Sequence, residues 1–182
     1  MMSNNTSEQK GSQMMSNNTS EQTITSIPAG QGPTYLLVGT ELLTFKALGE
    51  QTGGAYMTAE ITTPPGGGPP LHRHEPQELF YILEGEFAFP TVRNGELQTV
   101  RATPGDVVHI PSWIPHTYKN VGQQPGRFLI TLTPPTLEAY FEELGEPVSD
   151  PAHPPKPGPL DWERIEAVQR KYHIEYLTPP QP

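Results

Sequence analysis

The sequence predicts an all-β domain, a sandwich or barrel of antiparallel strands, followed by a short helical C-terminal tail. Three observations lead to this prediction. Residues 34–133 contain about nine short runs of β-forming residues, with turn signals between them at regular spacing. The 182-residue chain has 23 prolines and 17 glycines, which favour turns and short strands over a helical bundle. Amphipathic helical patterns begin only after Pro135.

The N-terminal segment carries an internal duplication. The nonapeptide MMSNNTSEQ occupies residues 1–9 and recurs identically at 14–22, after the linker KGSQ. A segment with so little apolar content has nothing to pack, so the duplication is not a structural repeat. It is either a cloning or start-site artefact or a natural tandem duplication. We favour the artefact, with the natural start near Met14 or Met15, and expect residues 1–30 to be disordered.

The first strands are predicted between residues 34 and 63. The run TYLLVGTELLTFKAL at 34–48 alternates and is rich in aliphatic residues. In the next run, GGAYMTAEITT, one face is apolar and the other mainly polar; the apolar face consists of Ala55, Met57, Ala59 and Ile61. Such alternation indicates a strand with one buried side. The loop PPGGGPP follows.

Later strands come in hairpins. The run ELFYILEGEFAFPTV breaks at Glu84-Gly85 into two paired strands, and Asn94-Gly95 is a strong signal for the next hairpin turn. Further short strands are predicted within 96–100, 106–110, 116–121 and 127–133. We therefore expect a folded domain over residues 31–135 and a helical, proline-rich extension over 136–182.

Two helices are predicted in the extension. The first has Thr136 as its N-cap, Gly145 as its stop and an apolar stripe of Leu137, Tyr140, Phe141 and Leu144. A proline-rich connector at 150–159 leads to the second. That helix has Asp161 as its N-cap and an apolar stripe of Trp162, Ile165, Val168 and Tyr172. We expect its stripe to pack on the domain's own sheet or on a partner subunit rather than to bind a ligand.

Charge and composition exclude several function classes. The formal net charge is −9 and no run of basic residues occurs, which disfavours binding to nucleic acid. No apolar stretch approaches the roughly 20 residues needed to span a bilayer, and the N-terminus lacks the apolar region of a secretory signal. We therefore expect a soluble cytoplasmic protein without membrane contact. The absence of cysteine leaves histidine and carboxylate as metal ligands.

Chemistry-bearing residues gather in the stretch PPLHRHEPQELFYILEGE at residues 69–86. In an extended chain, residues two apart point the same way, so His72 and His74 share a face. Glu78 has the same parity, and this face continues into Phe80 and Ile82. Polar groups on an apolar interior face need partners. Binding one cation would satisfy both imidazoles and the carboxylate together.

A fourth candidate ligand lies downstream. In PGDVVHIPSWIPHTYKN, His116 opens a strand after a tight proline-flanked turn and shares a face with Tyr118 and Asn120. Three imidazoles and one carboxylate suit one divalent transition metal ion per chain and leave one or two coordination positions open. Fe, Mn, Ni, Co, Cu and Zn all remain candidates. The alternative is a metal-free pocket in which these side chains only form hydrogen bonds.

These two segments resemble the two sequence motifs of the cupin superfamily. The first motif matches at Gly66, His72, His74, Glu78 and Gly85. The second matches at Gly105, Pro111, His116 and Asn120, with Trp113 standing where the family usually has glycine. The resemblance implies a single-domain cupin, or monocupin, whose strands form a double-stranded β-helix, also called a jelly roll. It also implies that His72, His74, Glu78 and His116 hold the metal.

The C-terminal tail is similar to that of small cupins related to quercetin 2,3-dioxygenases. This resemblance implies a dioxygenase that acts with dioxygen on a flavonol or another enolisable aromatic substrate, with Glu78 as ligand and general base. Phe80, Ile82, Trp113 and Tyr118 are expected around the substrate, and a homodimer is expected by analogy. Two alternatives remain: an oxygen-independent isomerase, decarboxylase or lyase, and a non-catalytic binder of small molecules.

Overall fold

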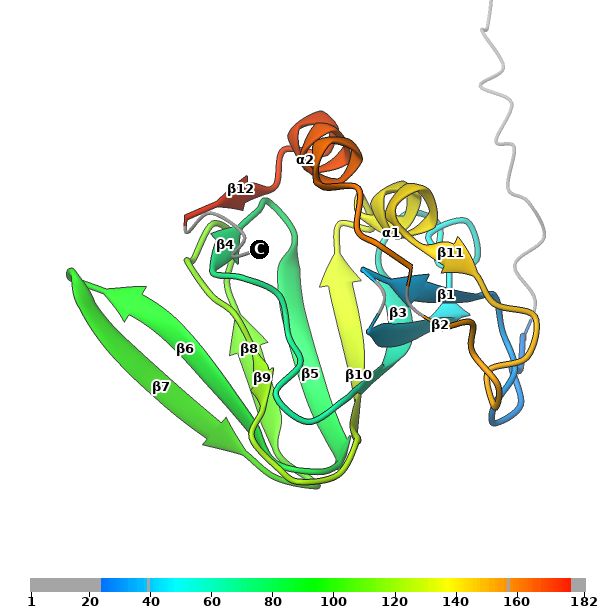
Figure 1. Ribbon diagram of the computed structural model, residues 1–182, viewed down its shortest axis with the longest axis horizontal. Helices are drawn as coiled ribbons and strands as arrows, with labels where there is room; N and C mark the ends of the chain where they lie inside the picture. The colour runs from blue at the N-terminus through cyan, green and yellow to red at the C-terminus, as the bar shows by residue number, and fades with distance from the viewer. Residues whose placement is uncertain (1–23, 39, 157, 178–182) are drawn as a thin grey trace, which may run out of the picture.

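The computed structural model describes residues 24–38, 40–156 and 158–177. Both copies of the N-terminal nonapeptide, and most of the tail predicted to be disordered, lie outside these residues. The described chain is built mainly from strands, with two helices near its end (Figure 1). No helix in the described part of the chain is both long and apolar enough to cross a membrane.

The largest sheet has seven antiparallel strands in the order β11-β1-β2-β3-β10-β5-β8. Its strands are β1 (Thr34–Leu37), β2 (Glu41–Ala47), β3 (Met57–Thr63), β5 (Gln77–Glu84), β8 (Val107–Ile110), β10 (Gly126–Thr133) and β11 (Glu146–Pro147). β10 inserts between β3 and β5, so strands distant in sequence lie side by side. The predicted all-β fold class is confirmed.

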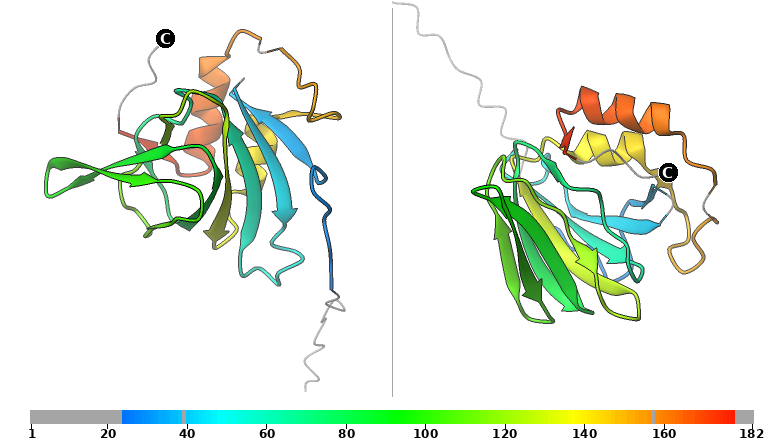
Figure 2. Two further views of the ribbon diagram at one scale, coloured as in Figure 1. Left: turned by 90° about the horizontal axis from the view of Figure 1, so that it is seen from below. Right: turned by 60° about the vertical axis from the view of Figure 1, so that its left-hand side comes forward.

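Two smaller sheets complete the fold. One has the order β7-β6-β9, with β6 (Phe87–Arg93), β7 (Glu96–Ala102) and β9 (Lys119–Asn120). The other pairs β4 (His72–Arg73) with β12 (Glu175–Tyr176). The β6–β7 hairpin extends away from the seven-stranded sheet in Figure 1, while both helices lie together over one end of the strands in the right-hand view of Figure 2.

The hydrophobic core lies between the sheets and follows the predicted alternation. On β3, Met57, Ala59 and Ile61 are buried, while the residues between them are half-buried. Aromatic rings fill the centre: Phe80 and Phe87 both pack edge-to-face against Phe128, with ring centroids 5.1 Å apart in each pair. Such edge-to-face pairs stabilise a core beyond the burial of their surface alone.

The helix termini confirm one cap and correct another. Helix α2 (Trp162–Lys171) begins after Asp161, whose side chain accepts a hydrogen bond of 3.0 Å from the backbone N–H of Arg164, as predicted. Helix α1 (Glu138–Leu144) begins after Leu137, so the prediction of Thr136 as its N-cap is wrong. The Leu137 side chain makes no capping bond; the helix start is instead anchored by packing, since Leu137 is buried in the core.

We expect Asp161→Ala to destabilise α2 by about 1 kcal/mol, because the N–H of Arg164 would lose its acceptor. For a domain of this size that corresponds to a decrease of about 2–4 °C in the Tm. Thermal unfolding followed by circular dichroism measures it. Asp161→Asn, which keeps a capping oxygen, is the matched control, and an Asp161→Ala variant as stable as wild type would contradict the role of the cap.

The end of the described chain pairs with a strand near the start of the histidine-bearing segment. β12 pairs with β4, more than a hundred residues away in sequence, and the backbone N–H of Leu177 donates to the carbonyl of Leu71 at 2.9 Å. An Arg73–Glu175 ion pair at 2.6 Å reinforces the contact. Because β4 also carries His72, this pairing places the C-terminal segment directly beside the predicted ligand cluster.

Candidate metal centre and ligand cavity

The two histidine-bearing segments are joined through their backbones. The N–H of His72 donates to the carbonyl of His116 at 2.9 Å, and the N–H of His116 donates back to His72 at 2.8 Å. This reciprocal pair is an antiparallel β-bridge that holds the start of β4 at His72 against His116. As a result the rings of His72 and His116 lie 4.4 Å apart, and that of His74 lies 5.4 and 5.1 Å from them.

Each imidazole is oriented by a hydrogen bond from its Nδ1 to a nearby backbone carbonyl. The Nδ1 of His72 lies 2.8 Å from the oxygen of Pro70, and that of His74 lies 3.1 Å from Pro76. The Nδ1 of His116 lies 2.7 Å from Ile114. Carbonyls only accept, so these contacts assign the proton to Nδ1 and leave a lone pair on each Nε2. Metal-binding histidines are commonly oriented in this way.

The ligand atoms of His72, His74 and His116 all lie within 4.8 Å of one another, and all three residues are buried. The structure therefore brings together the three imidazoles that the sequence predicted as ligands. Glu78 is not a member of this group of mutually close atoms. Its carboxylate nevertheless lies beside it, with Oε1 3.1 Å from the Nε2 of His74 and Oε2 3.1 Å from that of His116.

The cluster has unusual protonation equilibria. Burial, with the neighbouring His116, lowers the pKa of His72 to about 3, so this imidazole is neutral and free to coordinate. Burial raises the pKa of Glu78, but the neighbouring imidazoles of His116 and His74, in forms that carry a proton on Nε2, outweigh it and hold the pKa well below its ordinary value. Burial alone would lower the pKa of His116, yet the hydrogen bond and charge of Glu78 leave it above its ordinary value.

One buried atom indicates that a cation fits here. The Nε2 of His116 makes no well-aligned hydrogen bond within the described chain, although Glu78 lies only 3.1 Å away. In the neutral ring, with its one proton on Nδ1, that Nε2 and the carboxylate are two acceptors facing each other, which is unfavourable in a buried site. A divalent ion between the nitrogen and oxygen donors would satisfy both, and this donor set suits transition metals.

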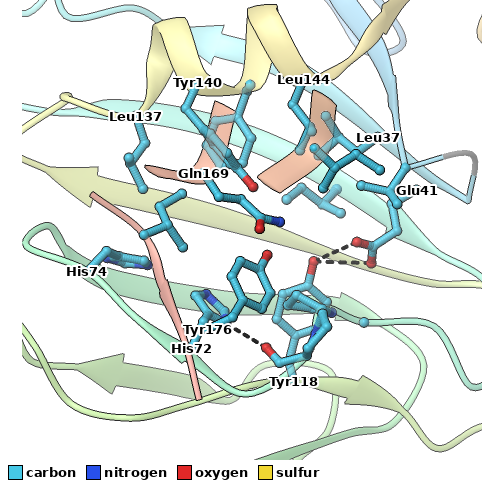
Figure 3. Close-up of a pocket in the computed structure, with 18 of the residues that line it drawn as sticks. Leu37, Glu41, His72, His74, Tyr118, Leu137, Tyr140, Leu144, Gln169 and Tyr176 are labelled. Carbon is cyan, nitrogen blue, oxygen red and sulfur yellow. Dashed lines mark hydrogen bonds between the residues drawn. The ribbon is translucent and has the colours of Figure 1, made fainter. Parts of the chain in front are cut away.

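A cavity of about 160 Å³ opens beside the cluster. That volume is about ten times what a single water molecule needs. His72 and His74 lie on one side of it, and strands of the large sheet pass beneath the side chains (Figure 3). Glu78 also lines the cavity. Further cover comes from the loop residues Gly68, Pro69 and Pro70 and from the C-terminal extension, through Leu137, Tyr140, Phe141, Leu144, Trp162, Ile165, Gln169, Ile174 and Tyr176.

The role expected for α2 is therefore corrected. Its Ile165 is buried as predicted, but this side chain and Gln169 line the cavity instead of only packing on the sheet. The reason is topological: α2 lies on α1 and leads into β12, which pairs with β4. Tyr176 then stacks on the ring of His72 at 5.6 Å. The extension thus closes the end of the barrel that carries the histidines.

Of the four residues expected around a substrate, only Tyr118 lines this cavity. Phe80 and Ile82 do face inward, but both are fully buried in the core, because they lie further along β5 than Glu78. Trp113 is 43% exposed and borders a separate surface hollow. Its φ of 62° lies in the left-handed region that favours glycine, and its N–H donates to the carbonyl of His74 at 2.9 Å.

Glu41 is the wall residue that the sequence analysis missed. Its carboxylate lines the cavity, and burial raises its pKa to about 7 despite hydrogen bonds from Thr63 and Tyr118. A signal was present, because Glu41 shares the parity of Leu43 and Phe45, the two fully buried residues of β2. A carboxylate at an inward position of an otherwise apolar strand face marks a candidate site residue.

Comparison with known proteins agrees with this architecture. The family model described as cupin domain matches residues 59–132. A Bacillus subtilis protein named quercetin 2,3-dioxygenase is 29% identical over 140 residues, covering 76% of this chain and 40% of that protein. An oxalate-binding protein of Thermotoga maritima is 35% identical over 79 residues, covering 43% of this chain and 62% of that protein.

A solved structure extends the comparison to most of the chain. The polyketide cyclase RemF of Streptomyces resistomycificus superposes with a TM-score of 0.53 at 19% identity, covering 83% of this chain and 96% of that one. At this identity the likeness concerns the fold alone. The matched segments span less than two thirds of the length of both sequence relatives.

Proposed function

The chain belongs to the cupin superfamily, and on that premise we propose that it is a metal-dependent dioxygenase acting on a flavonol-like or other enolisable aromatic substrate. One observation carries the proposal: three buried imidazoles form a cluster, and two of them, His72 and His74, line a cavity whose other walls are mainly apolar and aromatic. The similarity to quercetin 2,3-dioxygenase supports the substrate class.

The residues of the site have separate roles in metal binding and proton transfer. His72, His74 and His116 would hold the ion through Nε2, with Glu78 as the fourth ligand. A bound divalent ion supplies Lewis acidity that lowers the pKa of a substrate hydroxyl and favours its reaction with dioxygen. Glu78 is ionised, because the imidazoles of His116 and His74 beside it keep its pKa low. Since such a carboxylate is a weak base, it would take the proton only of a hydroxyl group that the ion makes more acidic. Tyr176 and residues of both helices line the cavity and would limit the access of water to a bound substrate.

The cavity walls favour an aromatic substrate over a small anion. The side chains that line it include Tyr118, Tyr140, Phe141 and Tyr176 together with several aliphatic residues. No lysine or arginine of the described chain is among them. A dicarboxylate such as oxalate would therefore find no cationic side chain there, so only the bound ion would offset the cost of burying its two charges.

The proposal predicts that Glu78→Gln lowers kcat by about 100-fold or more, because the amide cannot accept the substrate proton. Oxygen uptake with a flavonol and metal-loaded protein measures this, alongside the metal content of each variant. Glu75→Gln, an exposed carboxylate three residues earlier, is the matched control and should retain the wild-type kcat. A Glu78→Gln variant with full metal content and wild-type turnover would rule out the role as base.

The decisive experiment compares aerobic and anaerobic turnover. Metal-loaded protein is mixed with a panel of flavonols, and dioxygen consumption is recorded with loss of the flavonol absorbance. We expect both signals aerobically and neither anaerobically. If neither a flavonol nor any other enolisable aromatic compound causes dioxygen uptake at full metal occupancy, the proposal is wrong.

The second candidate is an oxygen-independent reaction at the same centre, such as a decarboxylation or isomerisation. The similarity to an oxalate-binding protein favours it. Loss of a flavonol under anaerobic conditions, without dioxygen uptake, would distinguish this reaction from that of a dioxygenase. A non-catalytic binder, the third alternative, would bind the flavonol with the same affinity in wild type and Glu78→Gln and turn over neither.

A further inference from the structure

Glu41 is a buried acid that the proposed chemistry does not use. It lies at the start of β2 and is only 8% exposed, and its side chain contributes to the cavity wall. In Figure 3 it lies at the opposite end of the cavity from His74. Its position therefore differs from that of the metal-ligand cluster, although both groups border the same space.

The Glu41 carboxylate is held in a fixed orientation, but its capacity to accept hydrogen bonds is not fully used. Thr63 donates to Oε1 at 2.7 Å, and the Tyr118 hydroxyl lies 3.1 Å from both oxygens. One phenol hydrogen serves one acceptor at a time, while an ionised carboxylate offers about four acceptor positions. The Glu41 oxygens thus keep unused capacity, and no lysine or arginine of the described chain shares the cavity wall with them.

Such an arrangement is unfavourable for the empty protein. A buried carboxylate with few donors and no neighbouring cation costs folding free energy, and burial raises the pKa of Glu41 to about 7. An apolar residue would continue the inward face of Leu43 and Phe45 without that cost. A ligand hydroxyl that donates to Glu41 would supply the missing partner.

We propose that Glu41, oriented by Thr63 and Tyr118, is a second polar anchor that accepts a hydrogen bond from a hydroxyl group of the ligand at the end remote from the histidines. This inference rests on the proposed function and narrows its substrate class. The ligand is an aromatic molecule with one hydroxyl directed to the metal centre and another at its far end. The aliphatic and aromatic walls contact the rings between them.

The test measures binding without turnover. Dissociation constants are determined anaerobically on metal-loaded protein for 3-hydroxyflavone, which has only the hydroxyl directed to the metal, and for 3,7- and 3,4′-dihydroxyflavone. Wild type should bind at least one dihydroxy compound about tenfold or more tightly than 3-hydroxyflavone, since hydrogen bonds to charged groups are strong. In Glu41→Leu this preference should fall to less than about threefold.

Controls keep the result interpretable. Glu60→Leu makes the same replacement on β3, where the carboxylate pairs with Arg127 outside the cavity, and should retain the wild-type preference. If Glu41→Leu does not fold, Glu41→Gln keeps an acceptor for Thr63 and Tyr118 and should still reduce the preference severalfold, because a neutral amide is a weaker acceptor than a carboxylate.

The outcomes separate this inference from the proposed function. The role of Glu41 is overturned if wild type does not prefer a dihydroxyflavone over 3-hydroxyflavone. It is also overturned if Glu41→Leu keeps the wild-type preference. Both outcomes hold whether or not flavonols are oxidised. A Glu41-dependent preference without any dioxygen uptake supports the anchor and overturns the dioxygenase. If none of the three compounds binds, both are overturned.

Discussion

Replacing His116 with alanine is expected to lower the affinity of the protein for a divalent metal by more than about 100-fold. Changes to groups that merely orient a metal ligand already cost 10–100-fold, and His116 would be a ligand itself. Two imidazoles and Glu78 would remain as ligands. In wild type the ligand atom of His116 lies within 4.8 Å of those of His72 and His74, and the variant would leave its coordination position open. The backbone pair between residues 72 and 116 does not involve the side chain and should persist.

Competition with a chromophoric chelator, using Ni²⁺, Co²⁺ or Zn²⁺, measures the affinity, and elemental analysis gives the stoichiometry. Wild type should bind one ion per chain. Stability gives a second measurement: at a free metal concentration of about 100 times Kd, binding should stabilise wild type by about 2.7 kcal/mol and the variant hardly at all.

His109→Ala is the matched control, because this exposed imidazole lies on β8 with Nε2 3.1 Å from Gln77, outside the cluster. It should bind the metal as wild type does. A His116→Ala variant that still takes up one ion with unchanged affinity would show that the three imidazoles are not the metal site.

Glu41→Gln is expected to stabilise the protein at alkaline pH. The pKa of Glu41 is raised from 4.5 to about 7 by burial, so the folded state holds this proton more tightly than the unfolded state does. The benefit of the protonated form is fully present below about pH 4.5 and is lost as the pH rises through about 7. Above that range wild type buries a charge that the amide lacks, at a cost of roughly 3 kcal/mol.

Urea unfolding of both proteins between about pH 4.5 and 9, in the same metal state, tests this prediction. The difference in unfolding free energy should be near zero at the acidic end, grow between pH 4.5 and about 7, and level off above. Glu50→Gln, an exposed carboxylate, controls for the change of one unit in net charge. A Glu41→Gln variant that gains nothing at about pH 8.5 would show that the carboxylate is well solvated or compensated.

The local pattern of the chain accounts for the parts of the fold and site that the sequence predicts well. In a strand, successive side chains point to opposite faces, so the parity of His72, His74 and Glu78 already places them on one face. The buried side of β3 and the Asp161 cap follow from short-range rules of the same kind. These features depend on a few neighbouring residues, which the sequence contains in full.

Long-range packing explains where the structure departs from these local rules. Phe80 and Ile82 have the parity of Glu78, yet parity does not tell how far along the barrel axis a cavity extends. The stripe of α2 is apolar, yet apolarity does not say whether it meets a sheet or the wall of a cavity. Thr136 was a reasonable cap by residue type, whereas the packing of Leu137 decides where α1 starts.

By itself, then, the sequence determined the all-β class, the inward faces of β3 and β5 and the identity of the histidines that meet. The tertiary structure alone decided what closes the space beside them and that Glu41 faces it. The physical reason is distance along the chain. β12 pairs with β4, and Tyr118 reaches Glu41, across 102 and 77 residues. No local periodicity encodes contacts of that range, because they depend on how all the intervening strands are ordered in the sheet.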